Sequence, residues 1–218
     1  MRNGECGRRS DVTPHSAFRT PHCVGILAIQ GDFEAHARAL ERVRAVPVLI
    51  KHAEQLRDVA ALVLPGGEST TARKFLLRDG LADAIRELAG RGCPVLGTCA
   101  GAILLAREVS NHVVAGMVVP ESQPGLGLID IVIRRNAYGR QLSSFIARRE
   151  TPVFPGEPLE MVFIRAPIIE RVGPGVSVLA EHDGSPVMVR QGSLLAATFH
   201  PELTDDPRVH RYFVDMIG

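Results

Sequence analysis

Cys99 is the residue of this chain whose surroundings most clearly suggest chemistry. It lies between Gly97 and Gly101 in residues 95–105, where an apolar strand gives way to an apolar helix. A turn with glycine two residues before and two residues after a nucleophile bends so sharply that the central side chain stands clear, and the next backbone N–H opens the helix. The same pattern fits a buried structural cysteine, because free cysteine packs as a small hydrophobic residue.

A thiol nucleophile needs a base, and the chain offers one about a hundred residues downstream. His200 can take the proton of Cys99 and return it to a leaving amine, while Glu202 can hold the imidazole in the required tautomer. A lone histidine after a strand is more often a hydrogen-bonded structural residue. The carboxylate two positions later and the cysteine turn upstream favour the catalytic interpretation.

A cysteine, a histidine and a carboxylate predict acyl transfer: the thiolate attacks an amide carbonyl, an amine leaves, and water hydrolyses the thioester. The tetrahedral intermediate needs N–H donors for its oxyanion. We expect one donor from Ala100, at the start of the helix. The other is expected from Gly67, because a glycine loop lets the backbone approach a ligand. A plain tight turn is the alternative for that loop.

Alternating strand and helix patterns in the first half of the chain indicate the fold class. The expected strands are 24–29, 46–50, 61–64 and 95–98, and the expected helices are 32–44, 69–77, 81–89 and 102–106. The alternation predicts a three-layer α/β fold with helices on both faces of an open, mostly parallel sheet. Ligands bind such sheets at the carboxyl ends of the strands, where both Gly67 and Cys99 fall.

The pattern changes after Glu108. Residues 118–123 are expected to form a loop and 126–134 an extended segment. Residues 162–164 are expected to form a strand, and three later segments are expected to form strands separated by turns: 176–181, 187–190 and 194–198. We expect these three to form an antiparallel C-terminal extension of the sheet that brings His200 and Glu202 to its edge. An amphipathic helix is expected at 208–217, with its inner face formed by Val209, Tyr212, Phe213 and Met216.

Composition limits the classes of protein and partner. A chain of 218 residues with 45% hydrophobic content is long enough for one domain with a sizeable core, and its net charge of +1 gives no reason to expect nucleic acid as a partner. No apolar run is long enough to cross a membrane. The cysteines, at positions 6, 23, 93 and 99, lack a zinc spacing, so we expect reduced thiols, no bound metal and a cytoplasmic location.

Residues 1–22 combine turn formers and arginines without periodicity. They are expected to form a flexible tail, followed by a single domain over residues 23–218. The tail has no apolar segment of the kind that a secretory signal requires.

Several motifs give the chain a family resemblance. The sequence Gly-Thr-Cys-Ala-Gly at 97–101, together with residues 64–69 and 199–202, resembles the class I glutamine amidotransferases. Five segments in family order narrow the resemblance to the glutaminase subunits of pyridoxal 5′-phosphate synthases: 26–31, 65–71, 135–141, 163–167 and 200–204. The resemblance runs from about Val24 to the end of the sequence.

The resemblance implies hydrolysis of L-glutamine to L-glutamate and ammonia. Cys99 would be the nucleophile, His200 the general base and acid, and Glu202 the carboxylate that orients it. The residues implied to bind glutamine are Gly67, Glu68, Ser69, Arg135, Ile164 and Arg165. A guanidinium suits the α-carboxylate of glutamine, although a structural ion pair is the alternative for the two arginines.

The resemblance also implies a partner. The family passes its ammonia to a barrel-shaped synthase subunit, which builds pyridoxal 5′-phosphate from a pentose phosphate and a triose phosphate. The chain would therefore act in a hetero-oligomer and carry no cofactor of its own, because pyridoxal 5′-phosphate is the product of the complex. Family glutaminases are generally weak without the synthase. The chain departs from the family pattern in the tail and in residues 118–123.

Two other functions fit part of the pattern. One is a class I glutaminase that serves a different acceptor, such as imidazole or anthranilate synthesis, but residues 135–141 and 163–167 speak against it. The other is a non-catalytic redox or binding module on the same fold. Such a module has no need of the spacing between His200 and Glu202.

Overall fold

A computed structural model describes residues 21–29, 31–76, 80–114, 117–120, 125–135 and 144–218 of the chain. The expected tail lies outside these residues, apart from positions 21 and 22. No helix in the described part of the chain combines the length and apolar character needed to span a membrane. The cysteines described, Cys23, Cys93 and Cys99, are free thiols as expected.

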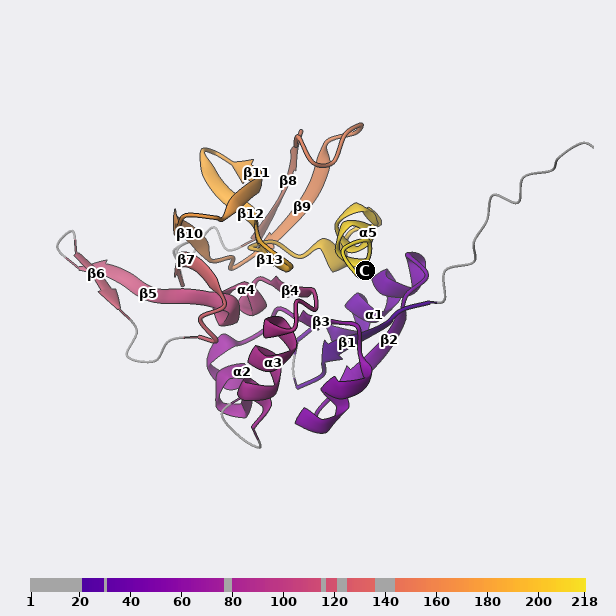
Figure 1. The fold of residues 1–218 in the computed structure, drawn as a ribbon. Coiled ribbons are helices and arrows are strands. Elements are labelled where there is room, and N and C mark those ends of the chain that lie inside the picture. Colours follow the sequence, from indigo (N-terminus) through magenta and orange to yellow (C-terminus); the bar gives the residue numbers. More distant parts are fainter. Residues whose placement is uncertain (1–20, 30, 77–79, 115–116, 121–124, 136–143) are drawn as a thin grey trace, which may run out of the picture.

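A seven-stranded sheet forms the centre of the structure, in the order β11-β12-β13-β4-β3-β1-β2 (Figure 1). Pairing is parallel from β2 through β13, and antiparallel between β13, β12 and β11. The strands are β1 (Cys23–Leu27), β2 (Val46–Ile50), β3 (Ala61–Leu64), β4 (Val95–Thr98), β11 (Ser177–His182), β12 (Ser185–Gln191) and β13 (Leu194–Ala197). The predicted mostly parallel sheet is confirmed.

Helices cover both faces of this sheet. They are α1 (Phe33–Arg42), α2 (Ser69–Leu76), α3 (Leu81–Gly90), α4 (Ala100–Leu105) and α5 (Arg208–Val214), with short 3₁₀ turns η1 (Ala53–Asp58) and η2 (Pro201–Leu203). Alternate residues of a strand point to opposite faces, so Val63 packs with α1 and α5, whereas Leu62 and Leu64 pack with α2, α3 and α4. The three-layer arrangement is therefore confirmed.

The strand that leads to His200 differs from expectation. β13 pairs in parallel with β4, with Ala197 opposite Thr98, so the prediction that an antiparallel strand delivers His200 is wrong. The strand at 194–197 is short and almost entirely buried, which suits a strand inside a parallel sheet. The antiparallel extension begins one strand further out, at β12.

Two smaller sheets lie beside the central one. One has the order β10-β7-β5-β6, and the other is the hairpin β8-β9. Their strands are β5 (Ala106–Val114), β6 (Met117–Pro120), β7 (Ile129–Arg134), β8 (Ser144–Arg149), β9 (Leu159–Ile164) and β10 (Ile168–Val172). The predicted loop at 118–123 is wrong for residues 118–120, which belong to β6, and residues 121–123 lie outside the described part.

The predicted helices at 208–217 and 102–106 are confirmed, but their bounds differ from the prediction. In α5, Val209 and Phe213 are buried and Tyr212 is partly buried, but the helix ends at Val214 rather than at residue 217. Helix α4 begins at Ala100, directly after the cysteine, and Ala106 already belongs to β5 rather than to the helix.

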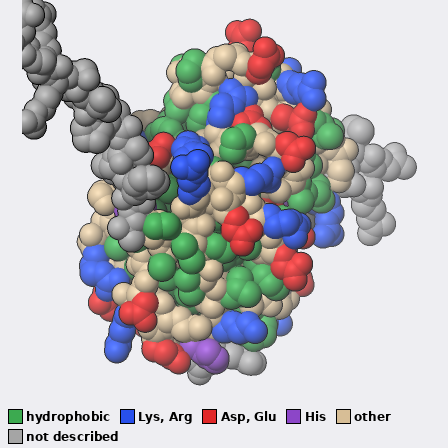
Figure 2. All heavy atoms as spheres, turned by 90° about the vertical axis from the view of Figure 1, so that its right-hand side faces the viewer, with side chains coloured by type: hydrophobic (Ala, Val, Ile, Leu, Met, Phe, Trp, Pro, Cys, Tyr) green, Lys and Arg blue, Asp and Glu red, His purple; other side chains and the backbone are tan. Residues whose placement is uncertain are grey.

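The outer face of the domain near α1 and β2 carries mixed side chains. Figure 2 shows acidic and basic side chains interspersed with hydrophobic ones on this face. β2 is an edge strand, and its Val46 and Leu49 are each 43% exposed. This mixture agrees with a net charge of only +1.

The turn around Cys99 depends on glycines on both sides. Cys99 has φ 48° and ψ −105°, a sparsely populated backbone conformation that costs about 1–3 kcal/mol. A Cβ at Gly97 would lie 2.5 Å from the carbonyl oxygen of Gly101, and one at Gly101 would overlap the carbonyl oxygen of Leu64. Both glycines therefore let α4 start directly against β4 and β3.

Replacement of Gly101 by alanine should destabilise the protein. The added Cβ meets backbone that cannot rotate away, so we expect the free energy of unfolding to fall by about 1–3 kcal/mol or more. Urea unfolding measures this change. Gly90→Ala is the control because Gly90, the last residue of α3, is also a helical glycine but has open space at its Cβ, and it should be neutral or stabilising. Equal stability of the two variants would contradict this account of the turn.

Candidate functional site

Three neighbouring strands place the candidate residues together. β13, β4 and β3 lie side by side, and at their carboxyl ends follow His200, Cys99 and the Gly66-Gly67 loop. The parallel register aligns these ends, because Ala197 pairs with Thr98 and Leu64 with Gly97. Residues far apart in the sequence thus converge at one edge of the sheet, as expected for an α/β fold.

Cys99 is held by its neighbours on both sides. Its backbone N–H donates to the carbonyl of Ala197 on β13 at 2.8 Å, and its thiol donates to the carbonyl of Ile164, at the end of β9, at 3.8 Å. The side chain is largely buried, with 7% of the residue exposed. Arg165, the residue after Ile164, has a positive φ of 44°, so the backbone turns sharply beside the thiol.

His200 links the thiol to the carboxylate of Glu202. Its Nδ1 lies 2.7 Å from Glu202 Oε1, and its backbone N–H donates to Val162 of β9 at 2.8 Å. Burial alone would lower the pKa of His200, but its hydrogen bonds to Cys99 and Glu202 and the charge of the Glu202 carboxylate raise it to about 10. The imidazole is therefore a cation at neutral pH.

Glu202 stays ionised although it is almost completely buried. Burial alone would raise the pKa of Glu202, but the hydrogen bond from His200 and the positive charge of that imidazole lower it below its usual value. An ionised carboxylate accepts the Nδ1–H of His200, which leaves Nε2 to face the thiol. We refer to Cys99, His200 and Glu202 as the candidate triad.

A second pair of histidines lies behind the candidate triad. Nδ1 of His36 on α1 is 3.0 Å from Nε2 of His210 on α5, and neither residue has any exposed surface. Burial lowers the pKa of His36, and burial together with the charge of neighbouring groups lowers the pKa of His210 to about 3. Unlike His200, both are neutral at physiological pH.

The Gly66-Gly67 loop is packed between the triad and the β1–α1 connection. A Cβ at Gly66 would lie 2.5 Å from Cε1 of His200 and 3.4 Å from Cβ of Cys99, and one at Gly31 would overlap the Gly66 carbonyl. Gly67 has a φ of 123°, which side chains rarely allow. Glycine at these positions therefore lets the loop backbone approach the thiol.

A cavity of about 230 Å³ opens at this edge. It brings together nine of the ten residues singled out from the sequence: Gly67, Glu68, Ser69, Cys99, Ala100, Arg135, Ile164, Arg165 and His200. Glu202 lies behind His200 rather than in the cavity wall. Of the motif at 135–141, only Arg135 belongs to the described residues.

Three further residues of the cavity wall were not among the expected site residues: Asp32, Ile103 and Pro167. Asp32 lies in the connection after β1, at the same edge as the other strand ends, so its position could have indicated it. Its carboxylate also lies close to the triad, since ligand-type atoms of Asp32, His200 and Glu202 fall within 4.8 Å of one another. His200 and Glu202 are hydrogen-bonded to each other. We therefore interpret the three side chains as the triad and a neighbouring carboxylate rather than as a metal centre.

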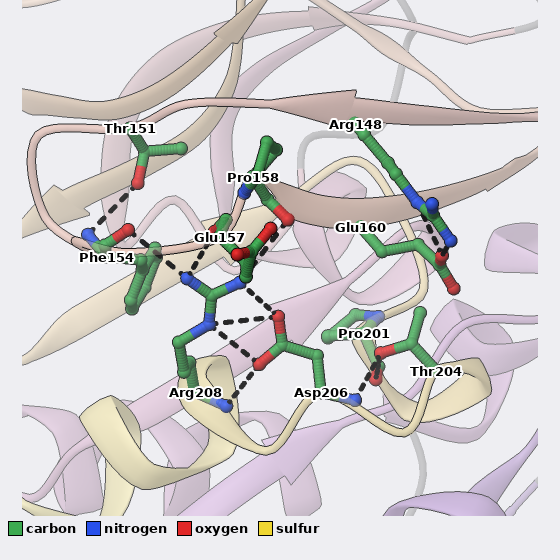
Figure 3. A network of polar contacts seen from close by, with 10 residues as sticks. All are labelled: Arg148, Thr151, Phe154, Glu157, Pro158, Glu160, Pro201, Thr204, Asp206 and Arg208. Carbon is green, nitrogen blue, oxygen red and sulfur yellow. Dashed lines mark hydrogen bonds and ion pairs between the residues drawn. The ribbon is translucent and has the colours of Figure 1, made fainter.

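A network around Arg208 fixes the segment that follows Glu202. Figure 3 shows the Arg208 guanidinium between Asp206 and the backbone carbonyls of Phe154, Glu157 and Pro158. Partial burial alone would raise the pKa of Asp206, but hydrogen bonds from Arg208 lower it below its usual value. The network ties the start of α5 to the connection between β8 and β9, and so holds η2 and its carboxylate in place.

Comparisons with known proteins agree with this geometry. The model of the SNO glutamine amidotransferase family matches residues 26–218. A solved structure described as a glutamine amidotransferase superposes with a TM-score of 0.79 at 44% identity, covering 89% of this chain and 98% of that chain.

Curated relatives are similar over the same range. The pyridoxal 5′-phosphate synthase subunit PdxT of Koribacter versatilis is 53% identical over 194 residues, which cover 89% of this chain and 95% of the relative. The protein of the same name from Solibacter usitatus is 52% identical over 200 residues, covering 89% of this chain and 98% of the relative.

The neutral His210 predicts a loss of stability in acid. Below its usual pKa of 6.5 the unfolded chain binds a proton at His210, whereas the folded chain does not until about pH 3, so stability falls as the pH drops. We expect His210→Gln to reduce the loss between pH 7 and pH 5 by about 2 kcal/mol, measured by urea unfolding at both values. His52→Gln, at an exposed position, is the control and should leave the loss unchanged. An unaltered loss in His210→Gln would contradict the prediction.

Proposed function

The chain belongs to the SNO glutamine amidotransferase family, and we propose that it hydrolyses L-glutamine to L-glutamate and ammonia through a thioester on Cys99. The observation that carries this proposal is the alignment of Cys99, His200 and Glu202 at the edge of the sheet, with the His200 Nδ1–Glu202 Oε1 distance at 2.7 Å. The cavity in front of Cys99 gives an amide substrate access to the thiol.

In the first half of the reaction, the Cys99 thiolate attacks the side-chain amide carbon of glutamine and the C–N bond breaks. His200 is cationic at neutral pH, so it can protonate the leaving nitrogen as ammonia forms. Neutral His200 then removes a proton from water, which attacks the thioester and releases glutamate. Glu202 keeps Nε2 of the imidazole directed at the reacting atoms throughout.

Each tetrahedral intermediate needs N–H donors for its negative oxygen. Under this proposal the donors are the backbone N–H groups of Ala100 and Gly67. Ala100 opens α4 next to the nucleophile, and the Gly66-Gly67 loop approaches Cys99 without an intervening side chain. Two such donors would favour the tetrahedral intermediate over the flat amide.

The cavity wall has groups suited to an amino acid. Under this proposal Arg135 and Arg165, both in the cavity wall, bind the α-carboxylate of glutamine, and Ile164 with Gly67, Glu68 and Ser69 encloses the remainder. The carboxylates of Asp32 and Glu68 line the same cavity and can accept hydrogen bonds from the α-ammonium group of glutamine. Charges of both signs in one small cavity fit a zwitterionic substrate.

We assign the ammonia to a barrel-shaped synthase subunit that makes pyridoxal 5′-phosphate. Support comes from the relatives with about half of their residues identical, which are named as subunits of pyridoxal 5′-phosphate synthase. In this assignment pyridoxal 5′-phosphate is the product of a hetero-oligomeric complex and not a cofactor of this chain. A nucleophilic thiol also fits the reducing conditions of the cytoplasm.

Cys99→Ala should abolish glutamate release from glutamine. A covalent nucleophile cannot be replaced, so we expect kcat to fall by about four orders of magnitude or more. The loss of kcat in Glu202→Ala should be about one to two orders of magnitude smaller than that in Cys99→Ala, because Glu202→Ala removes orientation of His200 rather than the bond-forming atom. Cys93→Ala, at another free thiol, is the control and should keep the parent kcat. Equal losses in Cys99→Ala and Glu202→Ala would show that the carboxylate does more than orient His200.

The partner is tested by measuring glutamate release with and without the synthase subunit. We expect the rate to rise when the pyridoxal 5′-phosphate synthase subunit is added, and the two proteins to copurify. No rise with this subunit, combined with a rise when the acceptor synthase of another class I glutaminase is added, would reassign the ammonia. No glutamate release with any synthase would support the non-catalytic alternative.

A further inference from the structure

His36 lies directly behind the candidate triad and connects four parts of the structure. Its Nε2 is 3.1 Å from Oγ1 of Thr98 and 3.4 Å from Oε2 of Glu202, and its Nδ1 is 3.0 Å from Nε2 of His210. His36, Thr98 and His210 are fully buried. One imidazole thus joins α1, the residue before the nucleophile, the triad carboxylate and α5.

The position of the hydrogen on His36 follows from its surroundings. Both histidines are neutral, so the contact between His36 and His210 contains one hydrogen. If it belonged to His36 Nδ1, a lone pair on Nε2 would face the negative Oε2 of Glu202. Repulsion disfavours that arrangement, so the hydrogen of His36 is on Nε2, and His210 donates to Nδ1.

The remaining atom of His210 agrees with this assignment. With its hydrogen on Nε2, His210 has only a lone pair on Nδ1. Among the described residues, Nδ1 of His210 has no hydrogen-bond partner. An acceptor left without a partner in the interior is consistent with a histidine whose single N–H is committed to His36.

Glu202 has one oxygen that the triad itself does not satisfy. Oε1 faces His200, but Oε2 is buried and has no partner in hydrogen-bond geometry among the described residues. A buried carboxylate oxygen is costly without a donor. Nε2 of His36 lies 3.4 Å from this oxygen and in hydrogen-bond geometry with Oγ1 of Thr98, so a small movement would bring its N–H to ordinary hydrogen-bond length, about 2.9 Å, from Oε2.

We propose that His36 is a positioning residue for glutamine hydrolysis, whose Nε2–H holds the second carboxylate oxygen of Glu202 and ties that carboxylate to Thr98, directly before the nucleophile. His210 keeps the hydrogen of His36 on the required nitrogen. The inference rests on the proposed function, because it assumes that Glu202 orients His200. It adds a residue on α1 that the candidate triad needs but does not include.

The test compares two conservative replacements. The side-chain amide nitrogen of glutamine reaches close to the place of Nε2, whereas that of asparagine reaches only the place of Nδ1. With the synthase subunit present, we expect His36→Gln to keep kcat within about fivefold of the parent and His36→Asn to lower it about 10- to 100-fold, as for other residues that support a reactive group. KM for glutamine should change less than twofold in both, since His36 does not line the cavity.

Leu40→Ala is the control for a general loss of packing in α1. Leu40 is fully buried in the same helix, so its truncation weakens the packing without removing a polar contact to the carboxylate. Rates are normalised to the concentration of active sites, which is measured by titrating Cys99 with a glutamine analogue that reacts with its thiol. We expect normalised kcat in Leu40→Ala to stay within about twofold of the parent. A loss equal to that of His36→Asn would overturn the proposal, as would equal kcat in His36→Gln and His36→Asn.

Glu202→Gln separates failure of this inference from failure of the proposed function. If Glu202→Gln is impaired and His36→Asn has the parent kcat, the positioning role of His36 is wrong and the triad stands. If Glu202→Gln has the parent kcat, the orienting role of Glu202 and the positioning role of His36 are both wrong, while glutamine hydrolysis on Cys99 stands. If the parent releases no glutamate with the synthase present, the proposed function and this inference are both wrong. Impairment of Glu202→Gln and His36→Asn, with recovery in His36→Gln, supports both.

Discussion

The candidate site depends on the close approach of backbone to backbone where three strands end. Gly101 lets α4 begin against Leu64 of β3, and Gly66 lets the next loop lie against the His200 ring. Gly31 in turn leaves room for the Gly66 carbonyl. A side chain at any of these positions would separate the strand ends that carry the thiol, the imidazole and the loop. The chemistry therefore rests on the absence of Cβ atoms as much as on the reactive groups.

Within that frame, two imidazoles flank one buried carboxylate in different charge states. His200 faces Oε1 of Glu202 and is cationic, whereas His36 lies near Oε2 and is neutral. The difference follows from their other neighbours. His200 also faces Cys99, which stabilises the cation, whereas His36 faces a neutral histidine and a hydroxyl. The Glu202 carboxylate can thus orient His200, which exchanges protons, through one oxygen, and lie near His36, whose N–H does not exchange, with the other.

The predictable parts of the fold and site were those with strong local patterns. The sharp turn at Cys99, the spacing of His200 and Glu202 and the alternation of the first four strands and their helices all appear in short stretches of sequence. The parallel pairing of β13 does not, because four apolar residues fit either direction of pairing. The second sheet was missed because its strands give weak local signals: β5 follows α4 without a break, and β10 has only five residues and no alternation of buried and exposed positions.

The position of His36 was equally hidden in the sequence. It lies among the apolar residues that α1 turns toward the core, and nothing within α1 shows that Thr98, Glu202 and His210 surround it. Contacts between residues 62 to 174 positions apart become visible only when the sheet is assembled. Asp32 is different: it was not singled out either, but its place after the first strand would have been enough to indicate the edge of the sheet.

The order of the strands also has a consequence for the newly made chain. β4 and the Cys99 turn leave the ribosome about a hundred residues before β13 adds His200, and parallel pairing between such distant segments is slow to form. Until β13 inserts beside β4, the cysteine lacks both its cationic neighbour and the backbone acceptor at Ala197. The nucleophile is thus synthesised long before its base, and the triad is complete only once the last parallel strand of the sheet is in place.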